Sequence, residues 1–194
     1  MQHIKTPNDI PGIIGLFAFR PETAEPMNQL AEILLRQASS LLKWERELIA
    51  AYVSHLNECT FCYNTHSAMA RHWIVSDLTD DTRLKDDKSI IEAVMRDYLS
   101  APISEKLKAL LTIASKVQED ARKVLPKDIE AARNQGATDM EIHDTVLIAA
   151  AFCMYNKYVD GLGTLEWEEP GIYDERARLT AENGYSAKFE ANVV

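Results

Sequence analysis

Glycine and proline are scarce in this chain, with seven of each among 194 residues. An all-β protein needs many turns, and turns draw heavily on these two residues, so their scarcity argues against that fold class. Apolar runs are short as well, and none approaches the roughly 20 residues that a membrane-spanning helix needs. The N-terminal residues from Met1 to Pro7 lack the apolar core of a secretion signal, so neither export nor a membrane association is expected.

Cysteine and positive charge are also in short supply. Three cysteines are an odd number, which suits a reducing compartment better than a disulfide framework, so a cytoplasmic location is predicted. The formal net charge is −9, whereas a nucleic-acid-binding surface must be basic, so no nucleic-acid partner is expected. The remaining composition, 46% hydrophobic and 26% charged, is that of a globular protein whose length fits one well-cored domain.

Apolar residues recur with helical spacing along most of the chain, and no segment alternates with period two over the length of a strand. Thr138 and Glu141 form a capping-box pattern, Pro126 suits the first turn of a helix, and a break is expected at 57–58. The chain is therefore predicted to be all-α and multi-helical. Helices are expected at about 27–40, 43–57, 59 to beyond 70, 89–99, 104–118, 126–135 and 138–160, with a polar surface loop at 77–88.

Three parts of the chain are expected. Residues 1–26 form an N-terminal arm, residues 27–165 a single helical domain, and residues 166–194 a C-terminal tail or arm. Segments 47–56 and 108–117 share their apolar spacing, which predicts two similar helical halves within the domain. The arm and the tail around Trp167 carry more apolar surface than a small helical core requires, so a homo-oligomer is predicted.

The segment from Cys59 to His66 carries the strongest chemical signal. Its two cysteines are three residues apart and His66 follows Cys62 by four, so the three side chains share one face of a helix. A Cys-x-x-Cys pair is a dithiol that can close reversibly, often with lowered thiol pKa values. The positive end of the helix dipole would favour a thiolate at Cys59. His66 can take the Cys62 proton and pass it to a leaving oxygen.

Three interpretations of this cluster are open. In one, the cysteines and His66 are ordinary core residues. In another they bind zinc with a fourth ligand such as His72 or Glu47, although structural zinc sites usually take a second ligand pair from a distant segment, and the chain has no other such pair. The third, which we favour, is a redox-active dithiol that needs no metal or cofactor: an oxidant converts Cys62 to a sulfenic acid, and Cys59 condenses with it.

A family resemblance supports the third interpretation. It is carried by Cys59, Cys62 and His66 together with the preceding run Glu45-Arg46-Glu47-Leu48-Ile49-Ala50. These residues resemble the signature of the AhpD-like alkylhydroperoxidases, which belong to the carboxymuconolactone decarboxylase superfamily. Residues 156–163 are similar to the end of the core helix in its peroxidase-related branch, and the resemblance covers about residues 30–163.

The resemblance implies an all-helical AhpD-like fold, homo-oligomers and thiol-dependent peroxidase activity. It implies a hydroperoxide as substrate and an external thiol or dithiol as reductant. Carried over by position, Cys62 is the peroxidatic thiol, Cys59 the resolving thiol, and Glu47 with His66 a proton relay. The family often has a histidine between the cysteines, where this chain has Phe61, so a shorter relay is expected. Decarboxylases of the superfamily lack the dithiol, which argues against lactone decarboxylation.

Glu47 and Cys153 have simpler interpretations of their own. Glu47 stands in the first turn of a helix, where an acidic residue is usually a surface charge, and it reaches the thiols only if the chain folds back near Asn57. Cys153 stands among apolar residues and is expected to be an inert core residue. The alternative to an enzyme is a redox sensor or oligomeric binding protein whose dithiol responds to oxidants without turnover.

Overall fold

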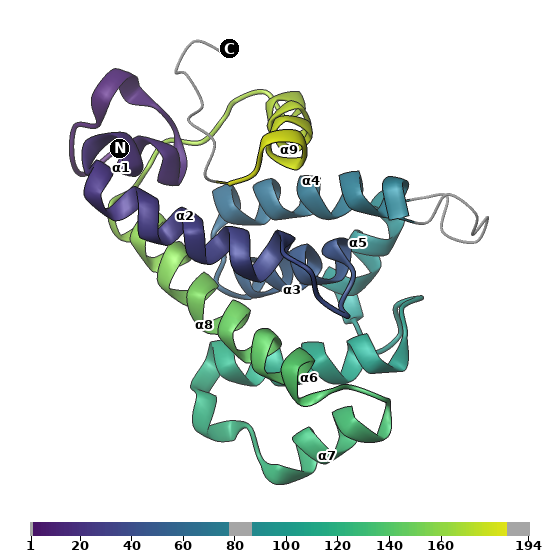
Figure 1. The fold of residues 1–194 in the computed structure, drawn as a ribbon. Helices are drawn as coiled ribbons and strands as arrows, with labels where there is room; N and C mark the ends of the chain where they lie inside the picture. Colours follow the sequence, from purple (N-terminus) through teal and green to yellow (C-terminus); the bar gives the residue numbers. More distant parts are fainter. Residues whose placement is uncertain (1, 78–86, 186–194) are drawn as a thin grey trace.

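A computed structural model of the protein describes residues 2–77 and 87–185, and helices are the only regular secondary structure in those two ranges. The prediction of an all-α fold is confirmed. The α-helices, shown in Figure 1, are α1 (Gly12–Phe19), α2 (Pro21–Arg36), α3 (Lys43–Leu56), α4 (Thr60–Asp77), α5 (Asp87–Asp97), α6 (Glu105–Asp120), α7 (Pro126–Asn134), α8 (Asp139–Gly161) and α9 (Gly171–Asn183). The same two ranges also contain the 3-10 turns η1 (Pro7–Asp9) and η3 (Ala121–Lys123).

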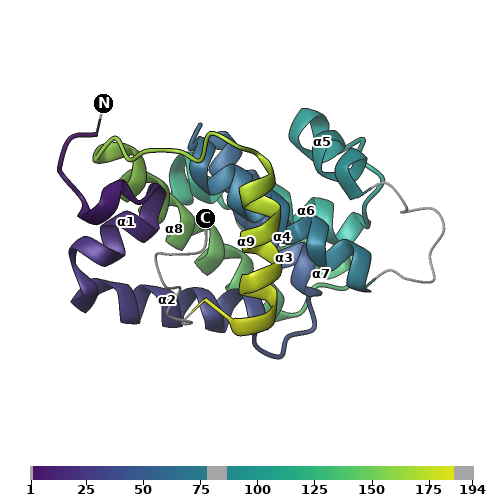
Figure 2. The ribbon, with the colours of Figure 1, turned by 90° about the horizontal axis from the view of Figure 1, so that it is seen from above.

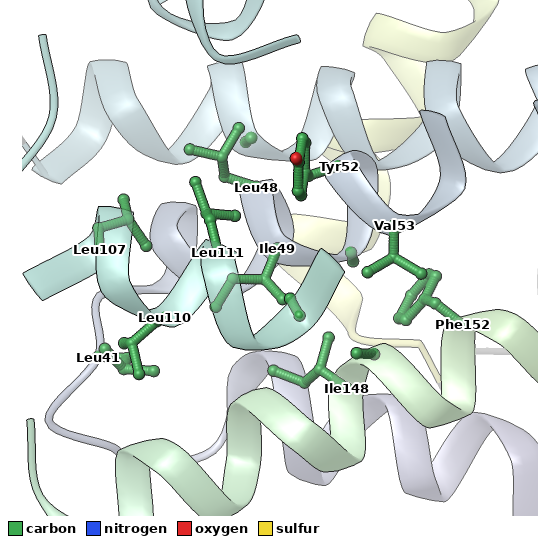
Figure 3. Packing of buried hydrophobic residues seen from close by; sticks show 14 of the residues in the cluster. Leu41, Leu48, Ile49, Tyr52, Val53, Leu107, Leu110, Leu111, Ile148 and Phe152 are labelled. Carbon is green, nitrogen blue, oxygen red and sulfur yellow. The ribbon is translucent and has the colours of Figure 1, made fainter. Parts of the chain in front are cut away.

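Helix α3 is the centre of the fold, and it contacts α2, α4, α5, α6 and α8. Every residue from Trp44 to Ser54 is buried, the polar ones included. Leu48, Ile49 and Val53 lie in the core among side chains of α6 and α8, namely Leu110, Leu111, Ile148 and Phe152 (Figure 3). Each large apolar side chain buried in this way contributes roughly 1.5–3 kcal/mol. A functional group on α3 therefore has a rigid support.

Several helix boundaries follow the signals read from the sequence. At the start of α8, the Thr138 hydroxyl accepts the Glu141 N–H at 3.2 Å, and the Glu141 carboxylate accepts the Thr138 N–H at 2.8 Å, so the predicted capping box is confirmed. Pro126 is the first residue of α7, where the N–H that it lacks would have no helical partner. The break predicted at 57–58 separates α3 from α4.

The two ends of the chain differ from the expected pattern. Helix α2 begins at Pro21 and not near residue 27, because Pro21 is itself a good first residue and Pro26 lies on the exposed side. The charged tail forms α9, which packs on α4 (Figures 1 and 2). The N-terminal arm runs beside the segment after α8, since the N–H groups of His3 and Gly12 donate to the carbonyls of Leu162 and Leu165, both at 2.9 Å.

Two expectations concern the surface of the molecule. The polar loop expected at 77–88 lies almost entirely outside the described residues. Among the helices that the structure describes, none combines the length and the apolar character needed to cross a membrane.

Candidate active site

A tight turn reverses the chain between α3 and α4. The Glu58 N–H donates to the His55 carbonyl and the Cys59 N–H to the Ser54 carbonyl, both at 3.0 Å, which is the bond pattern of a Schellman motif. Glu58 has a φ of 59°, in the left-handed region where glycine is usual. Because the reversal takes only residues 57–59, α4 packs directly back along α3.

This reversal brings Glu47 to His66. Nδ1 of His66 lies 2.7 Å from Oε2 of Glu47. Glu47 is fully buried and His66 is 8% exposed, so the surface interpretation of Glu47 is wrong. A carboxylate only accepts hydrogen bonds, so Nδ1 carries the proton in this contact. In the neutral ring Nε2 is then left with a lone pair and can act as a base.

A third side chain completes this buried pair. The hydroxyl of Tyr185, which follows α9, donates to Oε1 of Glu47 at 2.8 Å. Both carboxylate oxygens of Glu47 therefore have a donor. The His66 ring is fixed between two aromatic rings: Phe152 of α8 packs edge-on with ring centroids 4.5 Å apart, and Tyr185 stacks at 6.1 Å.

The two thiols of the motif lie at the N-terminus of α4. Cys59 is the residue before the helix, and its carbonyl accepts the Tyr63 N–H at 2.9 Å. Cys59 is fully buried, Cys62 is 3% exposed, and both are free thiols. His66 follows Cys62 by one turn of the same helix.

The surroundings of Cys59 favour its protonated thiol. A hydrogen bond with the Cys62 side chain raises the pKa of Cys59, and burial and the Asp160 carboxyl raise it further. The backbone N–H of Cys62 acts in the opposite direction and is outweighed. The argument from the helix dipole, which favoured a thiolate at Cys59, is therefore overruled by the surroundings of the sulfur.

The C-terminal part of α8 forms the wall beside the thiols. Nδ2 of Asn57 donates to Oδ1 of Asn156 at 2.8 Å, and Nδ2 of Asn156 donates to the Ser54 hydroxyl at 3.1 Å, which fastens α8 to the turn. One helical turn later, the Asp160 carboxyl reaches Cys59. Partial burial raises the pKa of Asp160, and the hydrogen bond with the Cys59 thiol opposes that rise. Cys153 packs against the core from a half-buried position, so it is less enclosed than expected.

Aromatic side chains cover the dithiol. Phe61, between the cysteines, is 4% exposed and packs edge-on against Tyr173 of α9, with ring centroids 6.0 Å apart. Gly12 of the N-terminal arm lies so close that a Cβ atom there would be 2.1 Å from the Phe61 ring. Trp167 packs against the same cluster. These side chains leave the two thiols almost without exposed surface.

The geometry does not favour the zinc interpretation. Within residues 2–77 and 87–185, no three His, Cys, Asp or Glu side chains are grouped as a metal site requires. Of the two candidates for a fourth ligand, His72 packs on the ring of Trp73, with centroids 5.3 Å apart, and Glu47 is hydrogen-bonded to His66.

Sequence reasoning did not find two residues of this site. Tyr185 is 119 positions from His66 and stands alone in a charged tail, so no local pattern marks it. Asp160 stands within the run 156–163, which the family resemblance marked without giving this residue a role. A contact between distant segments is the only signal for either residue.

Comparisons with known proteins found a family model and several solved structures that are similar to this chain. The model of the carboxymuconolactone decarboxylase family matches residues 21–77, the segment from α2 to α4 that holds Glu47, Cys59, Cys62 and His66. The chain is similar to an uncharacterized peroxidase-related protein with an alkylhydroperoxidase AhpD core from Ralstonia eutropha JMP134, at 26% identity and a TM-score of 0.71 over 87% of this chain and 82% of that one. No curated protein matches the sequence significantly.

Two further solved structures share the fold. An uncharacterized peroxidase-related protein from Silicibacter sp. TM1040 is 25% identical with a TM-score of 0.69, over 85% of this chain and 79% of that one. A protein of unknown function from Agrobacterium tumefaciens is 20% identical with a TM-score of 0.66, over 87% of this chain and all 100% of that one.

Proposed function

The chain belongs to the AhpD-like group of the carboxymuconolactone decarboxylase superfamily, and on this basis we propose that it is a thiol-dependent peroxidase that reduces hydroperoxides through Cys59 and Cys62. The observation that carries the proposal is the buried Glu47–His66 pair, joined at 2.7 Å one helical turn beyond Cys62. A thiol with an oriented imidazole beside it is the arrangement that nucleophilic catalysis by cysteine requires.

In the first step, Nε2 of His66 takes the proton of the Cys62 thiol, and the Glu47 carboxylate stabilises the imidazolium. The Cys62 thiolate then attacks the terminal oxygen of the hydroperoxide. The O–O bond breaks, and two electrons pass from sulfur to the peroxide, so Cys62 becomes a sulfenic acid. The alkoxide that leaves takes the proton from His66 and departs as an alcohol.

In the second step, the Cys59 sulfur attacks the sulfur of the Cys62 sulfenic acid. The S–S bond forms and the S–O bond breaks. The leaving hydroxyl group takes up the proton of the Cys59 thiol and departs as water, and Asp160 transfers this proton. The raised pKa of Cys59, caused first by its hydrogen bond with Cys62, suits this resolving role because Cys59 stays a thiol until the sulfenic acid has formed. An external thiol or dithiol then reduces the disulfide.

A redox sensor that reacts once without turnover is the second candidate function. The observation that favours it is the cover over the dithiol, which leaves Cys59 and Cys62 almost without exposed surface. A disulfide that forms beneath this cover is out of reach of an external thiol reductant, so the protein would react once with the peroxide and then stop.

Turnover distinguishes the two functions. The reduced protein is mixed with an excess of cumene hydroperoxide and dithiothreitol, and the peroxide consumed per chain is measured. A peroxidase consumes many equivalents, and Cys62→Ser abolishes the reaction. Cys153→Ser is the matched control and should leave the rate unchanged, because Cys153 has no proton relay beside it. Consumption that stops after one equivalent per chain would refute the peroxidase and favour the sensor.

A further inference from the structure

Tyr185 contacts the Glu47–His66 pair from a part of the chain that the proposed mechanism does not use. Its hydroxyl is 2.8 Å from Oε1 of Glu47 and 3.4 Å from Nδ1 of His66. Its ring is stacked on the His66 ring, with an interplanar angle of 21°. Glu47 is fully buried, so its second oxygen would otherwise be an unpaired acceptor in the core.

Helix α2 holds the segment that carries Tyr185. Oε2 of Glu32 accepts the Tyr185 N–H at 2.8 Å, and Nη1 of Arg36 donates to the Ala181 carbonyl at 3.0 Å. Gly184 has a φ of 86°, and a Cβ atom there would lie 2.9 Å from the Glu32 carboxylate, so glycine permits this close approach. The phenol is therefore positioned from outside the α3–α4 pair that bears the reacting groups.

We propose that Tyr185 is a positioning residue of the proton relay, whose hydroxyl fixes the Glu47 carboxylate in the orientation that keeps the His66 proton on Nδ1 and the lone pair on Nε2. The catalytic consequence rests on the proposed peroxidase function, whereas the proton positions belong to the resting protein. Without the hydroxyl, Oε1 of Glu47 loses its donor, and the carboxylate is free to turn or to take up a proton itself.

Tyr185 acts as a donor across the neutral range. The ionisable groups that face it are Glu47 on α3, His66 on α4, and Glu32 and Arg36 on α2, while α8 presents the ring of Phe152 to His66. Burial, followed by the nearby Glu47 carboxylate, raises the pKa of Tyr185 well above the usual 10.0, and the Arg36 charge opposes this only in part. The phenol therefore keeps its proton at neutral pH and is a hydrogen-bond donor there.

Tyr185→Phe tests the proposal because it keeps the ring and removes only the hydroxyl. A carboxylate that has lost a donor holds protons more strongly, both its own and that of the adjacent imidazolium. We therefore expect the acid limb of the kcat/KM profile to move upward by about one pH unit, the size expected for one hydrogen bond to a charged group. Tyr155→Phe is the matched control: its buried hydroxyl donates to the Met27 carbonyl at 3.1 Å, and its loss should leave the profile unchanged.

NMR of the histidine ring nitrogens tests the same proposal without any activity. His66 is identified among the five histidines by the signal that His66→Gln removes. In the wild type we expect a protonated Nδ1 and an unprotonated Nε2, with a titration midpoint that Tyr185→Phe raises by about one unit. A folded Tyr185→Phe protein with an unchanged midpoint and acid limb overturns the proposal, whether or not peroxide is turned over. A raised midpoint without peroxide turnover supports the role of Tyr185 and refutes the peroxidase function.

Discussion

Replacing Glu47 by glutamine changes which nitrogen of His66 carries the proton. In the wild type, Oε2 of Glu47 accepts from His66 and Oε1 accepts from Tyr185. Glutamine has one acceptor oxygen and one donor nitrogen, so it cannot accept both bonds. With its oxygen toward Tyr185, its amide nitrogen donates to Nδ1 and drives the ring proton to Nε2, which then cannot act as a base. With its oxygen toward His66, the buried tyrosine hydroxyl loses its acceptor.

The size of the effect follows from the cost of that unpaired hydroxyl. Leaving a buried donor without a partner costs about 1–3 kcal/mol, so the orientation that places the proton on Nε2 is favoured by this amount. At about 1.36 kcal/mol for each factor of ten, the tautomer with a basic Nε2 becomes roughly 5- to 150-fold less populated. We therefore expect Glu47→Gln to lower kcat/KM by about 10- to 100-fold. The protein should stay folded, because in the favoured orientation the glutamine accepts a hydrogen bond from Tyr185 and donates one to His66.

The assay is peroxide consumption under a dithiol reductant, with thermal unfolding measured in parallel. The double variant Glu47→Gln/Tyr185→Phe is the sharper test, because no hydroxyl remains to select the orientation of the amide. Its activity should fall by less than the product of the two single effects, which is the sign of a direct coupling. Unchanged kcat/KM in folded Glu47→Gln would refute the assignment of Glu47 to the relay.

Three further predictions concern the cover, the stability and the assembly. Gly12→Ala should destabilise the fold by about 1–3 kcal/mol, because Gly12 has a φ of 60° and a Cβ atom there would clash with the Phe61 ring. Labelling of the thiols in the native protein should also become faster. Unchanged stability and labelling would contradict the close contact between Gly12 and Phe61. Lys116 donates hydrogen bonds of 2.7 Å to both carboxylate oxygens of Asp128, and these bonds lower the pKa of Asp128. The stability that the ionised pair contributes is therefore fully present above pH 3.8, the ordinary pKa, and is lost as the pH falls through the lowered pKa. Urea unfolding should show Asp128→Asn about 1 kcal/mol less stable at neutral pH and equal to the wild type in strong acid, and a constant difference at all pH values would contradict this. Light scattering should give a mass of at least twice 21.9 kDa, as expected for the homo-oligomer predicted from the apolar residues of the N-terminal arm and of the tail around Trp167. A monomer would contradict that prediction.

The sequence was sufficient for those features that depend on near neighbours in the chain. Thr138 and Glu141 are three residues apart, so their reciprocal hydrogen bonds at the start of α8 could be predicted from their order alone. Pro126 at the first position of α7 is likewise a local preference. The shared face of Cys59, Cys62 and His66 follows from helical spacing, and that spacing identified the candidate site.

Features that depend on distant contacts could not be predicted. Acidic residues are seldom buried, so the residue type alone predicts that Glu47 lies on the surface. Only the turn through Glu58, which has a left-handed conformation, brings Glu47 to His66. Tyr185 and Asp160 reach the site from the ends of α9 and α8, far from the motif in sequence. The pKa of Cys59 is raised first by Cys62, its neighbour in the motif, and then by burial and by the distant Asp160, which could not be predicted from spacing.

The central claim is that Cys62 is the thiol that the hydroperoxide oxidises first, with His66 as its base. Cys59→Ser protein, which has no resolving thiol, is treated with one equivalent of hydroperoxide in the presence of dimedone, and the modified residue is located by mass spectrometry. The account predicts a sulfenic acid adduct on Cys62, formed about 100-fold or more slowly when His66→Gln is added. An unreactive Cys59→Ser protein, together with an adduct on Cys59 in Cys62→Ser protein, would contradict it.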